Sequence, residues 1–225
     1  MPTQQDIDAK RQRAPSKRAL ATRKRVLDAA ERVFAQRGFD GATIRDIAAE
    51  AGEPVGTIHH HGGGKEVLFH RTVARRAETL SQARLAELER LKSGDEVTLE
   101  ALIAAFVRPI FDLSRSDTRW RDYARLVAYV SADERWREVS AACFDPTAKV
   151  FLAELVSHMP GRPRSALAEG FVFTVSAMLA LLTSGGRIAD LGGGARETEA
   201  QIAHLVGFCS AGLHAGGRDR TGPRP

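Results

Sequence analysis

Apolar residues recur at three- and four-residue intervals along most of the chain, the spacing that places them on one face of an α-helix. The first such stripe consists of Val26, Ala29, Ala30, Val33 and Phe34. No stretch of the chain shows a competing strict alternation of apolar and polar residues, which is typical of a half-buried strand. The pattern therefore predicts an all-α protein.

Two short helices joined by a tight turn are predicted between Thr43 and Lys65. Thr43 can cap the first helix, because Asp46 stands at the capping-box spacing. Gly52 ends this helix where a positive φ is needed, and Pro54 allows a second helix to begin. Such a pair is typical of the helix-turn-helix motif, whose second helix enters the major groove of DNA.

A helix that precedes the motif and ends at Gly38 is expected to complete a three-helix unit. The predicted core of this unit is Val26, Ala30, Phe34, Phe39, Ile44, Ile47, Ala48 and Ile58. One long helix is predicted from Lys65 to about Leu91, and a larger helical bundle follows it. The predicted organisation is a disordered basic arm (1–15), a helix-turn-helix domain (16–65), a connecting helix (66–91), the bundle (92–215) and a disordered tail (216–225).

One predicted helix of the bundle is apolar on every side. The stretch from Gly170 to Gly186 is uncharged, but it is shorter than the ~20 apolar residues that cross a bilayer, so no membrane span is expected. A helix of this kind must be buried on all sides, and a second copy of the chain can supply the missing cover. We therefore expect a homodimer with an interface made of Val172, Val175, Leu179, Leu182, Ile202, Leu205, Val206 and Cys209.

The positive charge of the chain is concentrated at its start. Residues 1–25 hold eight basic residues against two aspartates, although the formal net charge of the whole chain is only +5. Beside a helix-turn-helix, such an arm can neutralise DNA phosphates and release counterions. A solvated leader without any partner is the alternative.

Composition and cysteine usage indicate a cytoplasmic protein. Hydrophobic residues make up 43% of the chain and charged residues 27%, which is ordinary for a soluble globular protein. Cys143 and Cys209 stand far apart, which fits a reducing cytosol and argues against a disulfide framework or a structural zinc site. No segment typical of a secretory signal lies near the start.

Residues 22–68 resemble the N-terminal domain of the TetR family of one-component transcriptional repressors. The matching features, in order, are Gly38-Phe39, the Thr-x-x-x-Ile-Ala-x-x-Ala-Gly pattern from Thr43 to Gly52, Gly56-Thr57 and Lys65-Glu66. The resemblance implies that Thr43, Thr57, His60 and Lys65 contact the DNA backbone and that Val55, Gly56 and His59 lie nearer the bases. Arg45, at the exposed start of the preceding helix, is a further candidate for contacting guanine.

Three residues depart from the pattern of the family. His59 stands where tyrosine is typical, Val55 where a polar or basic residue is common, and Gly62 where a buried phenylalanine usually packs under the recognition helix. Removing a buried phenylalanine side chain costs about 3–5 kcal/mol where the space cannot be refilled. We therefore expect a loosened junction between the recognition helix and the long helix after it.

No cofactor, metal or catalytic activity is expected. Consecutive helical side chains such as those of His59, His60 and His61 diverge by roughly 100°, whereas chelation on a helix needs i, i+4 spacing. The His-Gly-Gly-Gly stretch from His61 to Gly64 resembles the oxyanion loop of some esterases, but the G-x-S-x-G turn and the sheet that such enzymes need are missing.

Large side chains are concentrated in the bundle, where a pocket for an apolar molecule is expected. The candidate lining residues are Phe106, Ile110, Trp120, Tyr123, Tyr129, Trp136, Phe144 and Phe171. For any single one of them, a plain core residue is the preferred interpretation. The bundle is also similar to that of a TetR subgroup with the segments Trp136-Arg137-Glu138 and Phe144-Asp145-Pro146 and the Phe171-x-Phe173 stretch before Met178. Some members of such subgroups respond to acyl compounds.

The sequence therefore predicts a transcriptional repressor with a DNA-binding three-helix domain and a larger ligand-binding and dimerisation bundle. It would bind a palindromic double-stranded DNA operator as a dimer and be released by a small, largely apolar effector. The alternative is a helical dimeric interaction protein that has lost specific DNA binding, an interpretation that rests on Gly62.

Overall fold

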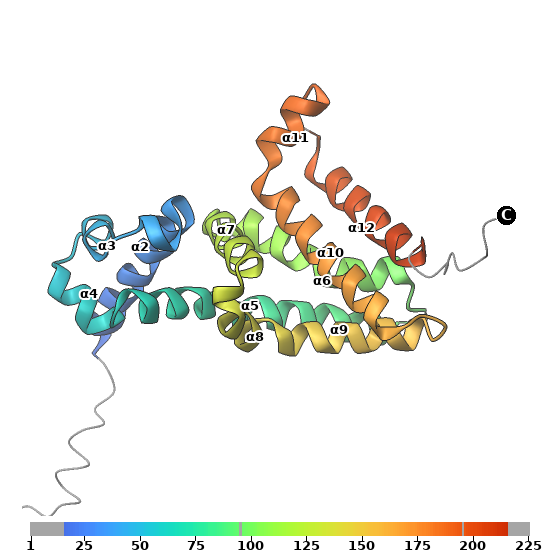
Figure 1. Cartoon of the computed structure of the whole chain (residues 1–225), viewed down its shortest axis with the longest axis horizontal. Helices are drawn as coiled ribbons and strands as arrows, with labels where there is room; N and C mark the ends of the chain where they lie inside the picture. The colour runs from blue at the N-terminus through green and yellow to red at the C-terminus, as the bar shows by residue number, and fades with distance from the viewer. Residues whose placement is uncertain (1–15, 95, 195, 216–225) are drawn as a thin grey trace, which may run out of the picture. The chain divides into compact units, whose positions relative to one another are not determined.

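The structure is a computed structural model that describes residues 16–94, 96–194 and 196–215 (Figure 1). Every regular element in these ranges is helical, and none of them is a β-strand. The predicted all-α fold class is confirmed. The predicted basic arm at residues 1–15 and the predicted tail at residues 216–225 lie outside the described residues.

The chain divides into two compact units, Met1–Thr72 and Val73–Pro225. The division falls within α5 (Lys65–Lys92), which is the long helix predicted from the sequence. The first two turns of α5 belong to the first unit because they carry Leu68 and Phe69, both fully buried. The Phe69 ring meets the Phe34 ring edge-to-face at 5.1 Å between centroids, so it belongs to the core that the sequence assigns to residues 26–58 alone.

The first unit consists of α2 (Lys17–Gly41), α3 (Ile44–Ala51), α4 (Val55–Gly62) and the start of α5. Gly38 has a φ of 68°, which interrupts the helical backbone of α2 where the sequence predicts an end. Glycine adopts this conformation without steric cost. Of the predicted core, Val26, Ala30, Phe34, Ile47, Ala48 and Ile58 are buried, whereas Phe39 and Ile44 are partly buried.

The second unit is a helical bundle around the central helix α6. Its further elements are α6 (Leu99–Ser116), α7 (Arg119–Ala132), the 3₁₀ turn η1 (Glu134–Trp136), α8 (Arg137–Cys143), α9 (Asp145–His158), α10 (Arg164–Thr183), α11 (Gly185–Gly192) and α12 (Thr198–Ala215). Helix α6 contacts α7, α9, α10 and α12. The core of the bundle includes Phe106, Tyr123 and Phe151, all nearly inaccessible to solvent.

Helix α10 is the one helix among the described residues that is long and apolar enough to cross a membrane by length and composition. A single helix of this kind is weak evidence for a span, because core helices of soluble proteins pass the same test. One side of α10 packs into the bundle through Leu167, Phe171, Met178 and Leu179. Val172 and Phe173 of the same helix are exposed.

Candidate functional site

The turn between α3 and α4 is fixed by the caps that the sequence predicts. The Asp46 N–H donates to the Thr43 hydroxyl at 3.1 Å, and the Thr43 N–H donates to the Asp46 carboxylate at 2.9 Å, which completes a capping box. The hydrogen bond from the Thr43 hydroxyl is the main cause that lowers the pKa of Asp46. Gly52 ends α3 in the left-handed region with a φ of 63°, and α4 begins directly after Pro54.

Helix α4 buries one side and leaves the other free. Ile58 and Gly62, one turn apart, face the core and are buried. The predicted base-contacting residues Val55, Gly56 and His59 lie on the exposed side, together with His60. A Cβ added to Gly56 would meet no heavy atom within 4 Å, so the α4 backbone can approach another molecule closely at this point.

The acidic residues around α3 are tied to arginines of α2. Arg32 pairs with Glu50 at 2.9 Å and Arg37 with Asp46 at 2.8 Å, and Arg25 donates to Glu53 at 3.1 Å. Arg45 is exposed on α3 and has no acidic partner among the described residues. Its guanidinium is therefore free to bind an external acceptor.

The other residues that are predicted to contact the DNA backbone lie on or beside the same two helices. Thr43 is exposed at the start of α3, and Thr57 is partly buried in the first turn of α4. Lys65 differs, because its ammonium lies 4.4 Å from the centre of the Phe39 ring and donates to the Asp40 carbonyl oxygen at 3.4 Å. A DNA phosphate would have to compete with these two contacts.

The three consecutive histidines, His59, His60 and His61, lie in the last turn and a half of α4. Within the described ranges, no group of three or more His, Cys, Asp or Glu side chains is placed to hold a metal ion. The His60 and His61 rings contact each other at 4.9 Å between centroids, while His59 and His60 are exposed.

The space beside Gly62 is already filled. A Cβ at Gly62 would lie 3.1 Å from a methyl carbon of Leu68, which is fully buried. In addition, Arg71 of α5 donates to the His61 carbonyl oxygen at 2.9 Å. Leu68 therefore packs against Gly62, and Arg71 ties the end of α4 to α5, whereas the loosened junction stays a prediction.

Gly62→Phe is expected to lower the free energy of unfolding of the first unit by about 1–3 kcal/mol, because the added ring must displace Leu68 from a packed site. Chemical denaturation followed by circular dichroism measures the change. Gly56→Phe on the same helix is the matched control, since its side chain enters open space. A stabilised Gly62→Phe variant would show that a void exists after all.

The second unit contains a cavity of about 350 Å³ that is lined by residues of α5 to α10. Of the predicted pocket residues, Phe106, Ile110, Phe144 and Phe171 lie in its wall. The wall also includes Leu80, Arg84, Val127, Ser131, Arg137, Ser140, Asp145, Ala148, Val172, Val175, Ser176 and Met178. Arg137 and Asp145 form an ion pair of 2.7 Å within this set.

The other four predicted pocket residues do not line this cavity. Tyr123 is fully buried and donates its hydroxyl to the Val73 carbonyl oxygen at 2.9 Å. Trp120 is buried under the Arg76 guanidinium, and Trp136 is buried as well. Tyr129 is partly buried and accepts a hydrogen bond from Arg135 at 2.7 Å. The candidate effector site therefore does not include these four residues, whose side chains pack within the bundle or pair with neighbouring residues.

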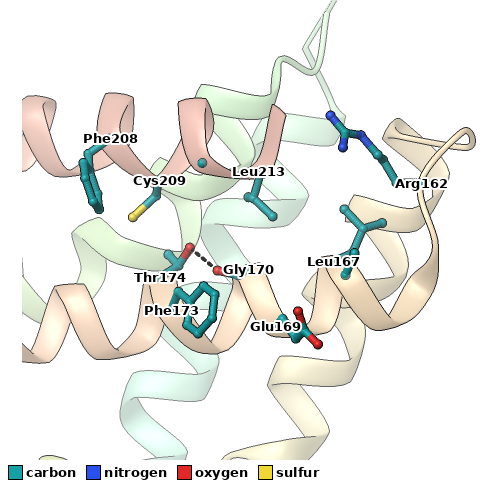
Figure 2. A pocket seen from close by; sticks show the side chains of 11 residues that line it. Arg162, Leu167, Glu169, Gly170, Phe173, Thr174, Phe208, Cys209 and Leu213 are labelled. Carbon is teal, nitrogen blue, oxygen red and sulfur yellow. Dashed lines mark hydrogen bonds between the residues drawn. The ribbon is translucent and has the colours of Figure 1, made fainter. Parts of the chain in front are cut away.

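A second depression, of about 320 Å³, runs along α10 and α12 (Figure 2). Phe173 of α10 and Phe208 of α12 lie along it and are 68% and 67% exposed. Its floor includes Leu213, against which a Cβ at Gly170 would collide, so the two helices are closely packed there. Leu191 of α11, a helix that contacts α10, is 79% exposed. We call the exposed apolar residues Phe173, Phe208 and Leu191 the outer face.

Most residues of the predicted dimer interface do not lie on the outer face. Leu179, Ile202, Leu205, Val206 and Cys209 are buried within the bundle of the same chain, and Val175 and Leu182 are partly buried. Only Val172 is exposed, and it borders the cavity of about 350 Å³. A buried side chain cannot present a surface to a partner, so the outer face replaces these residues as the candidate interface.

Sequence reasoning missed Arg84, Phe173 and Phe208 as site residues. Phe173 and Phe208 lie on the sides of α10 and α12 away from the bundle core, but the sequence does not reveal which side of a doubly apolar helix is covered. Arg84 stands in a helix rich in charges, so its residue type does not distinguish it from the exposed charged residues around it. The sequence signal for its burial is that Leu80 and Leu88 stand four positions before and after it. Residues at this spacing lie on the same face of a helix, and both leucines are buried.

Two family profiles match the chain, one for each unit. A profile described as "Bacterial regulatory proteins, tetR family" matches residues 26–72, and one described as "Tetracyclin repressor-like, C-terminal domain" matches residues 104–212. The first match covers α3 and α4, and the second covers most of the bundle.

Curated relatives are described as transcriptional regulators. The repressor AcnR of Corynebacterium efficiens is 38% identical over 81 residues, which cover 34% of this chain and 43% of the relative. The repressor KstR2 of Rhodococcus jostii is 31% identical over 118 residues, which cover 52% of this chain and 56% of the relative. The chain thus spans about half the length of these relatives. Neither relative is described as an enzyme, in agreement with the sequence prediction.

Solved structures share the fold across most of the chain. A TetR-like transcriptional regulator from Rhodococcus gives a TM-score of 0.57 at 16% identity and covers 91% of this chain and 98% of its own. FadR from Bacillus subtilis, solved in complex with stearoyl-CoA, gives a TM-score of 0.55 at 17% identity. The match covers 86% of this chain and 96% of the FadR chain. At these identities the likeness concerns the fold alone.

Proposed function

This chain belongs to the TetR family of bacterial regulatory proteins, and from that premise we propose that it is a cytoplasmic, DNA-binding transcriptional repressor. The observation that carries the proposal is the free side of α3 and α4. Arg45, Gly56, His59 and His60 are exposed there, while the acidic side chains of α3 are paired with arginines of α2. Such a surface offers hydrogen-bond donors and close backbone approach to a DNA groove.

The proposed DNA target is a palindromic operator bound by two copies of the chain. Two chains related by a two-fold axis would place their α4 helices in successive major grooves, about 34 Å apart. We propose that the outer face of α10 and α12 forms the contact between them. Support comes from the exposure of Phe173 and Phe208 along one depression, since large apolar groups exposed side by side are typical of an interaction surface.

The cavity of about 350 Å³ is the proposed effector site. A small molecule bound there would release the operator if it binds more tightly to a conformation that does not fit DNA. The cavity wall includes Leu80 and Arg84 of α5, and the same helix begins in the first unit. Continuity of α5 gives a physical link through which occupation of the cavity can reach the DNA-binding residues.

The alternative is an interaction protein without specific DNA binding, and it rests on Gly62. The repressor is favoured over it because Leu68 packs against Gly62. Titration of DNA from upstream of the protein's own gene at several salt concentrations separates the two functions. A repressor binds one palindromic segment tightly, with an affinity that falls steeply as salt rises, whereas an interaction protein shows only weak binding to any sequence.

Arg45→Ala is expected to weaken operator binding by about 1–3 kcal/mol, roughly fivefold to 150-fold, because a bidentate contact to a base is lost. Binding to unrelated DNA should change much less. Fluorescence anisotropy with labelled operator measures both affinities. Arg125→Ala, an exposed arginine of α7 that pairs with Asp122, is the control. Equal losses for both kinds of DNA would assign Arg45 to a phosphate instead of a base.

A further inference from the structure

The core of the second unit contains a charged side chain without an acidic partner. Arg84 is only 6% exposed, and its neighbours on α5, Leu80 and Leu88, are buried too. Its Nε donates to the Phe106 carbonyl oxygen at 2.9 Å, and its Nη2 lies 3.5 Å from the sulfur of Met178. The guanidinium carbon is 3.8 Å from the centre of the Phe106 ring. None of these contacts supplies a negative charge.

These contacts leave the guanidinium poorly satisfied. A thioether sulfur is a weak acceptor, and a guanidinium carries five N–H donors. The Nη1 group of Arg84 has no acceptor among the described residues. Burial lowers the pKa of Arg84 to about 9, an effect that Tyr123 partly opposes, so the side chain is still charged at neutral pH. A buried cation of this kind is costly unless an anion joins it.

Arg84 borders the cavity of about 350 Å³ at its buried end. Phe106, Ile110 and Met178 lie in the same part of the wall and are at most 4% exposed. Three other residues of the wall, Ser131, Ser176 and Val172, are exposed to solvent. A molecule in this cavity would therefore have its innermost end beside the guanidinium.

The one carboxylate in the wall is not available to Arg84. Asp145 pairs with Arg137 at 2.7 Å, and this pairing is the main cause that raises the pKa of Arg137. The wall thus holds two arginines and a single acid, so the cavity carries a net positive charge. This charge distribution favours an anionic ligand over a neutral or cationic one.

We propose that the cavity binds a small carboxylic acid with an apolar body, whose carboxylate pairs with Arg84. The planar guanidinium matches the two oxygens of a carboxylate, and a charge-assisted hydrogen bond of this kind is stronger than a neutral one. The apolar body lies against Phe106, Ile110 and Met178. A volume near the lower end for ligand pockets limits the acid to a compact molecule.

This proposal rests on the cavity being the effector site, and it sharpens the class of effector from an apolar molecule to an apolar acid. When the carboxylate of the acid pairs with Arg84, it removes the free-energy cost of a buried, unpaired charge that the protein bears without a ligand. The gain is available only in conformations that keep the cavity beside Arg84, which is the differential affinity that an effector needs. Because α5 carries Arg84, the same helix would respond to the acid.

The test compares acids with their uncharged amides. Octanoate and octanamide, and 3-phenylpropanoate and its amide, are titrated into the full chain without DNA by isothermal calorimetry. We expect at least one acid to bind roughly tenfold or more tightly than its amide, the ratio that loss of a charge-assisted hydrogen bond produces. Equal affinities for acid and amide in both pairs, including no detectable binding of any probe, overturn the proposal.

Substitution of Arg84 assigns the preference to this residue. In Arg84→Met, which is similar in length and apolar, the preference for the acid should disappear, and the melting temperature should not fall because an unpaired buried charge is removed. Arg84→Lys keeps the charge and should keep part of the preference. Arg125→Met, an exposed arginine outside the cavity, is the matched control. A preference that persists in Arg84→Met overturns the proposal.

The outcome is separable from the proposed function. The titration uses no DNA, so an acid preference that depends on Arg84 supports the proposal even if no operator is found. Conversely, specific operator binding together with equal affinities for acid and amide keeps the repressor function and rejects the acid.

Discussion

Replacing Phe173 and Phe208 together by aspartate is expected to convert the proposed dimer into a monomer of 24.5 kDa. Both rings belong to the outer face and are about two-thirds exposed, so charges placed there should leave the fold of the chain intact. Two aspartates on each copy would bring four carboxylates into an apolar contact, where desolvation and repulsion oppose association. Sedimentation equilibrium or light scattering measures the mass.

Loss of the dimer should also weaken operator binding. Two linked DNA-binding units gain about 10²–10⁴-fold in affinity over one, so the Phe173→Asp/Phe208→Asp protein should lose at least about a hundredfold on a palindromic operator. Val150→Asp on α9 removes another exposed apolar side chain of the same unit and serves as the control. If the double variant still sedimented as a dimer, the interface would have to lie outside the outer face.

Phe34→Ala is expected to destabilise the first unit by about 3–5 kcal/mol, which is the cost of emptying a phenylalanine site in a core. Phe34 is 1% exposed, and its ring contacts both Phe39 and Phe69, at 6.2 and 5.1 Å between centroids. A small unit has little stability to lose, because it buries a smaller share of its surface than a large one. Operator binding should therefore be abolished near physiological temperature.

The second unit should survive this substitution. Hydrogen exchange should lose protection in residues 26–69 while the amides of α6 and α10 keep theirs, because these helices pack in a core of their own. Leu20→Ala, at an exposed position of α2, is the control. Simultaneous loss of protection in both units would contradict the division of the chain into two separate cores.

Local signals in the sequence predict the first unit well. The capping box of Thr43 and Asp46, the positive φ of Gly52 and the interruption at Gly38 all follow from the conformational preferences of the residues themselves. Because such preferences act over a few neighbouring residues, they can be recognised without knowing the fold. The exposed side of α4 follows in the same way from the apolar spacing of the helix.

The junction after α4 shows where local reasoning ends. Comparison with the family pattern shows that an aromatic ring is missing at Gly62, but it does not show what fills the space. The replacement is Leu68, six residues further on and in the next helix. Packing is decided by which side chains reach a common volume, and this depends on the angle between two helices.

The sequence by itself determined the helical class, the helix-turn-helix with its caps and the long helix that starts at Lys65, since each depends on spacing or on the preferences of single residues. Only the tertiary structure decided which side of α10 faces the bundle, and so moved the candidate interface to Phe173 and Phe208. It also decided that Arg84 is buried beside a cavity. The physical reason is that burial belongs to contacts between distant segments, which a repeating pattern within one segment cannot specify.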